Sequence, residues 1–283
     1  MSTHEPVEKA AQQEAAIDPT RAFLRRSARP WQRFGDLMSM FVDSVAVLVS
    51  SIARGRFPWW DFLVQARFLV VVSLLPTVLI AIPFGLVLVL EVGGLTSQVG
   101  AASLVGGVIS TATIREAAPI ISGIVLAGAG GSAICADLGS RSTRNEIAAL
   151  RVMAVDPVER LVAPRVLAAM VVGVLLNGIV AFVGILTGYL AHVFVLNGSA
   201  GGFLGSFSAF ARSEDLIESC LKAAVFGMIA AVVASFQGLT CERGPAGVGD
   251  AVNRSVVVTG VSLFIVNLVI TQIFLVTVRP VLL

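Results

Sequence analysis

The sequence predicts an all-α integral membrane protein, in which one interfacial amphipathic helix precedes five transmembrane helices. The first observation behind this prediction is composition: of 283 residues, 56% are hydrophobic and only 13% are charged, whereas soluble domains carry about 25% charged residues. The second is the spacing of the charges, which leaves several long apolar stretches uninterrupted. Three scattered cysteines and two isolated histidines have the spacing of neither a disulfide framework nor a metal site.

Six charge-free stretches are candidates for membrane spans, because about 20 apolar residues cross the hydrocarbon core of a bilayer. One of them, 92–114, contains five glycines and several polar residues, so we interpret it as a partly inserted or re-entrant segment. The others predict five transmembrane helices at 68–90, 117–136, 166–196, 223–241 and 255–278.

The distribution of basic residues supports five spans and sets their orientation. With a cytoplasmic N-terminus, segments 1–67, 137–165 and 242–254 face the cytoplasm and carry 9, 5 and 2 of the 20 basic residues. A full crossing by 92–114 would instead place the five arginines of 137–165 outside. We therefore expect a multi-pass protein of the cell membrane with its C-terminus on the extracytoplasmic side.

The N-terminal part of the chain is expected to lie in the cytoplasm and on the membrane surface. Residues 1–30 predict a polar tail rather than a signal peptide, because the first twenty residues are charged and lack an apolar core. Residues 31–57 contain the predicted interfacial helix, whose apolar residues recur at i, i+3, i+4 and i+7. Packing of this helix on a soluble partner is the alternative. Trp59 and Trp60 follow as an aromatic anchor.

The loop 137–165 contains signals for two helix starts. Thr143 and Glu146 match the T-x-x-E capping box, which predicts a short helix over 144–153. Asp156 as a cap and Pro157 at the first helical position predict the start of the next helix. The loop should therefore contain a short helix that runs across the membrane face.

One side of this short helix is apolar. Ile147, Leu150 and Met153 share that side, whereas Arg144 and Arg151 lie on another. The apolar side either docks onto another protein or folds back onto the helices of this chain, and the residues alone do not decide between the two.

Small residues indicate close helix packing at two places. Gly184 and Gly188 form a GxxxG pair in the third predicted span. Minimal side chains let helix backbones approach closely in lipid, where apolar burial does not drive association. A second run in the predicted span before the loop consists of Gly128, Gly130, Gly131, Ser132 and Ala133, with Ala129 among them.

Polar residues at or within the predicted spans are candidate functional groups. Arg115 and Glu116 open the second predicted span and Lys222 opens the fourth, so these charges either snorkel to headgroups or ring the mouth of a cavity. Uncharged polar residues within the spans predict hydrogen bonds between helices; they are Asn177, Gln237, Asn267 and Gln272.

The sequence contains no catalytic constellation. The lysine of a G-x-x-x-x-G-K-[ST] phosphate loop is absent, since neither Lys9 nor Lys222 has that context. G-x-S-x-G and H-E-x-x-H are absent as well. We therefore expect a non-enzymatic chain without catalytic residues, metal or cofactor of its own, so that any ATP would be hydrolysed by another subunit.

The stretch 115–166 resembles the central segment of the MlaE/YrbE permease family, the membrane subunits of ABC lipid transporters that work with MCE-domain proteins. The sequence of residues 131–139 is similar to that of the "A" permease of paired actinobacterial systems, and weaker similarity extends over nearly the whole chain beyond residue 30. The family pattern is filled here by Arg115, Glu116, Pro119, Gly128, Gly131, Ser132, Ala133, Asp137, Leu138, Gly139, Glu146, Ile147, Ala149, Leu150, Met153 and Pro157.

The resemblance implies that the short helix is a coupling helix, seated in a groove of a cytoplasmic ABC ATPase dimer that binds ATP and Mg. The coupling residues it implies are Arg144, Glu146, Ile147, Ala149, Leu150, Arg151, Met153, Asp156 and Pro157. It also implies that polar residues lie near a lipid cavity, and these are Arg115, Glu116, Lys222 and Asn267. Some relatives carry an acid where this chain has Asn267, so a protonation role is not carried over.

The resemblance further implies a second YrbE-type permease, MCE-domain lipid-conducting proteins and a lipid substrate as partners, and no nucleic acid. The function expected is import of a hydrophobic lipid such as a fatty acid or a sterol, driven by the partner ATPase. The alternatives are a membrane scaffold for envelope proteins and a secondary transporter, although the sequence shows neither an internal repeat nor a charge at a span centre.

Overall fold

The computed structural model describes residues 19–55, 57–98, 100–242 and 244–278, which are helical apart from short connections and contain no strand. The chain divides into two compact units between Asp43 and Ser44, and the second unit contains the five helices that are long and apolar enough to cross a membrane. This count confirms the predicted all-α membrane fold with five spans.

The N-terminal helix α2 runs from Pro19 to Ala53 and therefore begins before the predicted start at residue 31. Within the first unit, the side chains of Met38 and Val42 are exposed, as the apolar face of an interfacial helix would be. Its place at the membrane surface stays a prediction. Residues 1–18 of the predicted tail lie outside the described residues.

The five spans are longer than the charge-free stretches, because each helix continues past its apolar core. Several are built from consecutive helical segments. The first, fourth and fifth spans are the single helices α3 (Trp59–Gln98), α10 (Ser213–Leu239) and α11 (Pro245–Val278). The second span, Val105–Thr143, consists of α4 (Val105–Ala112), η2 (Thr113–Ala117), α5 (Ala118–Val125), η3 (Leu126–Gly131) and α6 (Ser132–Thr143). The third span, Val158–Phe194, consists of η4 (Val158–Val162) and α8 (Ala163–Phe194). The segments η2, η3 and η4 are π-helical turns.

The stretch 92–114 is neither a re-entrant segment nor a separate span. Its first part ends α3, and its last part, from Val105 on, begins the second span after a short turn that contains η1 (Ala102–Leu104). Gly100 adopts a left-handed φ of +71° in that turn, which glycine tolerates without steric cost. Of the five glycines of this stretch, Gly100 thus lies in the connection, and the other four lie within α3 and α4.

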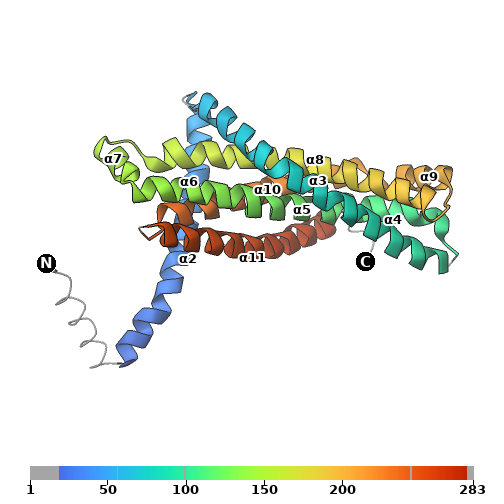
Figure 1. Cartoon of the computed structure of the whole chain (residues 1–283), viewed down its shortest axis with the longest axis horizontal. Coiled ribbons are helices and arrows are strands. Elements are labelled where there is room, and N and C mark those ends of the chain that lie inside the picture. The colour runs from blue at the N-terminus through green and yellow to red at the C-terminus, as the bar shows by residue number, and fades with distance from the viewer. Residues whose placement is uncertain (1–18, 56, 99, 243, 279–283) are drawn as a thin grey trace. The chain divides into compact units, whose positions relative to one another are not determined.

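Two short helices lie at opposite ends of the spans. α7 (Glu146–Val152) follows α6, and α9 (Ala200–Phe210) follows α8. Figure 1 shows α7 at one end of the packed spans and α9, which packs on α4, at the other. If the spans cross a bilayer, these two helices therefore lie on opposite sides of it.

Glycines set the closest contacts between α3 and α8. A Cβ atom added to Gly85 would lie 3.0 Å from the Cα atom of Gly184, and one added to Gly188 would lie 2.9 Å from Val89. The two backbones therefore touch, which confirms the close packing predicted from the GxxxG pair.

The small-residue run of the second span packs closely at only some of its positions. A Cβ atom on Gly130 would lie 3.1 Å from Leu69, and one on Gly131 would lie 3.7 Å from the Cβ atom of Ala234. Gly128 faces open space instead. The run lies largely within the π-helical turn η3, which rotates its residues away from a single helical face.

Candidate functional site

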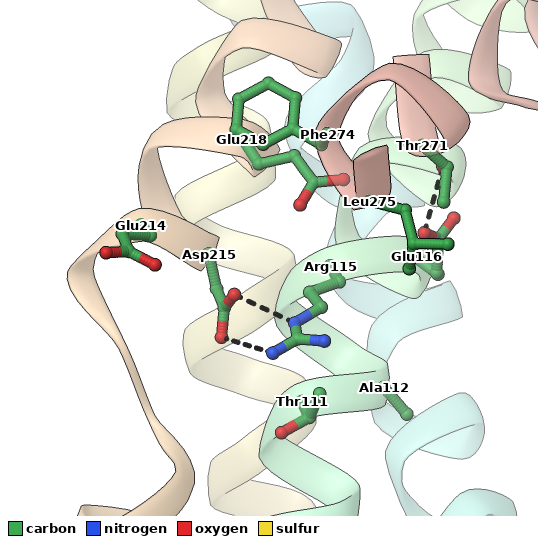
Figure 2. Close-up of a pocket in the computed structure, with 10 residues that line it drawn as sticks. All are labelled: Thr111, Ala112, Arg115, Glu116, Glu214, Asp215, Glu218, Thr271, Phe274 and Leu275. Atoms are coloured by element: carbon green, nitrogen blue, oxygen red, sulfur yellow. Dashed lines mark hydrogen bonds and ion pairs between the residues drawn. The ribbon is translucent and has the colours of Figure 1, made fainter. Parts of the chain in front are cut away.

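A pocket of about 260 Å³ lies between the second, fourth and fifth spans (Figure 2). Residues of α4 and η2, which are consecutive in the second span, of α10 and of α11 converge on it, so three segments distant in sequence form one site. Its lining residues are Thr111, Ala112, Arg115, Glu116, Glu214, Asp215, Glu218, Thr271, Phe274 and Leu275.

Arg115 on η2 is held by Asp215 on α10. Its Nε lies 2.9 Å from Asp215 Oδ1 and its Nη2 donates to Asp215 Oδ2 at 3.0 Å, as the paired dashed lines of Figure 2 show. The Asp215 side chain is only 3% exposed, whereas that of Arg115 is 24% exposed. Such a two-point pair fixes the orientation of the planar guanidinium group.

Lys222 on α10 lies behind two carboxylates. Its ammonium group is 2.9 Å from Glu116 Oε1 and 2.9 Å from Glu218 Oε1, and it also donates to the main-chain carbonyl of Arg115 at 3.0 Å. Two of these contacts are hydrogen bonds, to Glu116 and to the main-chain carbonyl, and the third is an ion pair with Glu218. The side chain is completely buried, so the alternative in which Lys222 snorkels to headgroups is wrong.

The position of Lys222 follows from where α10 begins. The helix starts at Ser213 rather than at residue 223, which places Lys222 about 14 Å inside it at 1.5 Å per residue. Lys222 therefore lies within the fourth span, four residues before the midpoint of α10, and not at its start.

Residues of α11 complete the network around Glu116. Asn267 Nδ2 donates to Glu116 Oε2 at 2.9 Å, and the hydroxyl of Thr271 donates to Glu116 Oε1 at 3.2 Å. The structure thus brings together the four residues that were grouped from sequence, Arg115, Glu116, Lys222 and Asn267.

Three further members of this network were missed from sequence. Asp215, Glu218 and Thr271 contribute contacts. The first two precede the charge-free stretch of the fourth span, so the sequence places them in a loop. The signal that could have found them is the spacing of Asp215, Glu218 and Lys222, which lie on one helical face at i, i+3 and i+7. The π-helical turn η2 in turn directs the adjacent Arg115 and Glu116 to different partners, and such turns are frequent at functional sites.

The chemistry of the pocket is that of binding. It combines ionised and hydrogen-bonding groups with an apolar wall from Ala112, Phe274 and Leu275. Among the described residues there is no group of three or more histidine, cysteine or acidic side chains that could hold a metal ion. An amphiphile, with a polar head and an apolar tail, is the type of molecule that such a surface suits.

The predicted coupling loop lies at the other end of the spans. The capping box does not form there: Thr143 ends α6 and its hydroxyl donates to the Ser140 carbonyl at 2.8 Å. Asn145, in the left-handed region with φ +61°, separates α6 from α7, which begins at Glu146. The second helix start is confirmed, since Asp156 Oδ1 accepts from Val158 N at 2.9 Å and Pro157 is helical.

The apolar surface of this loop differs from the predicted one. Ile147 is buried against the chain itself, because the late start of α7 turns it inward. Exposed apolar side chains occur instead at Val152 (88%) and Met153 (64%). Of the other predicted coupling residues, Pro157 is buried. The rest lie on the outer surface or at its edge: Arg144, Glu146, Ala149, Leu150, Arg151 and Asp156.

Ion pairs connect this loop to the spans. Arg165, which is 4% exposed, pairs with Asp137 at 2.5 Å, and Arg160 pairs with Asp61 on α3 at 3.2 Å. The hydroxyl of Ser51 donates to Glu159. Elsewhere in the spans, Asn177 and Ser219 exchange hydrogen bonds at 2.9 and 3.1 Å, which confirms the predicted interhelical role of Asn177.

Comparisons with known proteins agree with this architecture. The family described as Permease MlaE matches residues 62–273. A probable ABC transporter permease protein of Synechocystis is 33% identical over 65% of this chain and 70% of its own length. The chloroplastic protein TRIGALACTOSYLDIACYLGLYCEROL 1 of Arabidopsis thaliana is 30% identical over 80% of this chain and 65% of its own.

A third relative is the intermembrane phospholipid transport system permease protein MlaE of Haemophilus influenzae, which is 29% identical over 68% of this chain and 74% of its own. The family match covers more than half of the chain and includes both the polar pocket and the loop with α7. This chain, a multi-pass membrane protein, therefore belongs to the MlaE permease family.

Proposed function

We propose that this chain is the permease subunit of an ATP-driven transporter that imports a hydrophobic lipid, such as a fatty acid or a sterol. One observation carries the proposal: a pocket with charged walls lies between the spans, beside apolar side chains of α4 and α11. Ionisable groups within a membrane are costly and mark a substrate path by default. A lipid supplies a polar head for these groups and an apolar tail for the adjoining surface.

The names of the relatives support both the cargo and the energy source. The Haemophilus influenzae relative is named for phospholipid transport, and the Synechocystis relative is named an ABC transporter permease. Membership of the same family supports an equivalent role for this chain, and an apolar pocket holds lipid tails of many kinds.

The proposed complex contains a cytoplasmic ABC ATPase dimer, which binds ATP and Mg, a second YrbE-type permease and MCE-domain proteins that conduct the lipid. The N-terminus and α7 face the cytoplasm, and the C-terminus faces outward. The exposed side chains of Val152 and Met153 support contact between α7 and the ATPase, because large apolar residues on a polar surface mark an interaction site.

The ion pairs of the loop offer a route from the ATPase to the spans. When ATP closes the ATPase dimer, α7 moves with it. Arg160 then displaces α3 through Asp61, and Arg165 links α8 to the end of α6 through Asp137. The spans shift as rigid rods, because their glycine contacts leave no space for independent bending.

A secondary transporter is a second candidate, and the buried network around Lys222 favours it, because such proteins carry ionisable residues deep in the membrane. A scaffold for envelope proteins is a third. The three candidates differ in what moves the lipid: ATP hydrolysis by a partner, an ion gradient, or nothing.

Reconstitution separates these candidates. The complex, purified with its bound subunits, is placed in liposomes and the transfer of a fluorescent lipid is followed. We expect transfer that requires ATP and is lost in Glu116→Gln, whereas the exposed Glu91→Gln serves as the matched control. Uptake driven by an ion gradient without an ATPase would establish the second candidate, and co-purification without lipid transfer under any condition would establish the third.

A further inference from the structure

The polar pocket contains more negative than positive charge. Four of its ten lining residues are carboxylates, at Glu116, Glu214, Asp215 and Glu218, and one is a cation, Arg115. The buried ammonium group of Lys222 adds a second positive charge behind the wall. With four carboxylates and two cations, the site carries a formal charge of about −2 when all of these groups are ionised.

Neither cation is available to an incoming anion in full. The Lys222 ammonium group already has three oxygen atoms within 3.0 Å, and its side chain is 0% exposed, whereas that of Glu116 is 40% exposed. Arg115 uses its Nε and Nη2 on Asp215. A head group that enters the pocket therefore meets carboxylate oxygens and only one side of a guanidinium group whose charge is already compensated.

The remaining two carboxylates give the pocket its excess charge. Glu218, whose carboxylate points toward the space between α10 and α11 in Figure 2, shares Lys222 with Glu116. Glu214 is exposed at the start of α10 and lines the same pocket. Within a membrane, where charges are screened poorly, this excess opposes a phosphate or carboxylate head.

A neutral hydroxyl finds partners at the same place. Carboxylate oxygens accept from it, and Arg115 keeps donors on the side away from Asp215. Donor and acceptor positions are thus both present for an uncharged group.

We infer that the polar pocket selects lipids with an uncharged, hydroxyl-bearing head and rejects lipids with an anionic head. This inference rests on the proposed function, because it assigns the substrate class of that same pocket. Of the two lipids named there, a sterol satisfies the requirement through its hydroxyl group, whereas an ionised fatty acid does not.

Binding to the purified complex tests the inference with two probes of equal chain length, a monoacylglycerol and the corresponding lysophosphatidic acid. We expect the monoacylglycerol to bind at least tenfold more tightly. In Glu214→Gln/Glu218→Gln, which removes the two excess charges, we expect the affinity for lysophosphatidic acid to rise at least tenfold, so that the preference for monoacylglycerol falls.

Two controls keep the outcome decisive. Glu214→Gln alone changes an exposed residue and should produce part of the gain in affinity for lysophosphatidic acid. Glu91→Gln removes a charge outside the pocket and should produce none of that gain.

Tighter binding of lysophosphatidic acid to the unaltered complex, or equal affinities that neither variant changes, would overturn the inference while leaving a lipid-binding permease in place. Binding of neither probe, with no ATP-dependent transfer of any lipid, would instead overturn the proposed function.

Discussion

Replacing Lys222 with methionine is the most informative single change in the spans. Methionine keeps the length of the side chain and removes the ammonium group that two carboxylates share at 2.9 Å each. At an effective dielectric constant of about 20, one ion pair at about 4 Å contributes roughly 4 kcal/mol, from which the cost of desolvation is subtracted. Removing one partner of a buried ion pair costs about 3–5 kcal/mol, because the other charge is left uncompensated.

Two features of the network place the expected loss at the lower end of that range. Glu116 is 40% exposed and keeps hydrogen bonds from Asn267 and Thr271, so it retains partners when Lys222 is lost. Glu218, whose side chain is 9% exposed, accepts no hydrogen bond from Asn267 or Thr271 and therefore accounts for most of the lost stability. For a domain of this size, about 3 kcal/mol lowers the melting temperature by roughly 6 °C.

The assay is thermal unfolding of the purified permease in detergent, followed by tryptophan fluorescence. Lys222→Met should melt about 6 °C lower than the unaltered chain, and Lys222→Met/Glu218→Gln should recover at least half of that difference, because it removes the uncompensated carboxylate. Glu91→Gln should leave the melting temperature unchanged. If Lys222→Met melted within about 2 °C of the unaltered chain, or if the second substitution lowered the melting temperature further, the shared ammonium group would not stabilise these spans.

Three further predictions concern the loop, the helix contacts and a thiol. Glu146→Lys should abolish lipid-stimulated ATPase activity of the complex while insertion into the membrane is retained; unchanged stimulation would contradict the assignment of α7. Gly85→Ala should lower stability by about 1–3 kcal/mol, since its Cβ atom would lie 3.0 Å from Gly184 Cα, whereas Gly178→Ala meets open space and should not. Burial raises the pKa of the Cys241 thiol, so less of it is the reactive thiolate at neutral pH. Its maleimide labelling should therefore be slower than that of an ordinary thiol at pH 7 and should accelerate as the pH rises; equal rates at pH 7 would refute this.

The sequence predicts the number of spans because the hydrocarbon core imposes a minimum apolar length and because arginines mark one side of the membrane. It does not predict where the helices end, since charge-free length measures the apolar core and a helix extends beyond it. The fourth span shows the consequence. If the span began at residue 223, as predicted, Asp215 and Glu218 would belong to a loop. Because α10 begins at Ser213, both residues lie in the helix and line the pocket.

Local signals were reliable where their geometry depends on neighbouring residues alone. Asp156 caps the helix after the loop as predicted. The capping box at Thr143 fails because α6 continues through that residue, so its hydroxyl bonds within α6 instead. The inward turn of Ile147 depends in the same way on the left-handed Asn145 before it, a change of direction that helical periodicity does not contain.

The polar network was predictable in part. Arg115, Glu116 and Lys222 could be grouped because charged residues near or within a membrane are candidate functional groups, and Asn267 could be added from the family resemblance. That these residues form one network, with the ammonium group behind the carboxylates, required the packing of the second, fourth and fifth spans. Sequence spacing within each helix does not specify how three helices are rotated against one another.

The account depends most on the claim that α7 faces the cytoplasm, where an ATPase can reach it. Val152, whose side chain is 88% exposed, is the position to test. In a background without the three native cysteines, Val152→Cys is treated with a membrane-impermeant maleimide in intact and in permeabilised cells. The account predicts labelling only after the membrane is permeabilised, whereas equal labelling in intact cells would contradict the orientation of the spans and the contact with an ATPase.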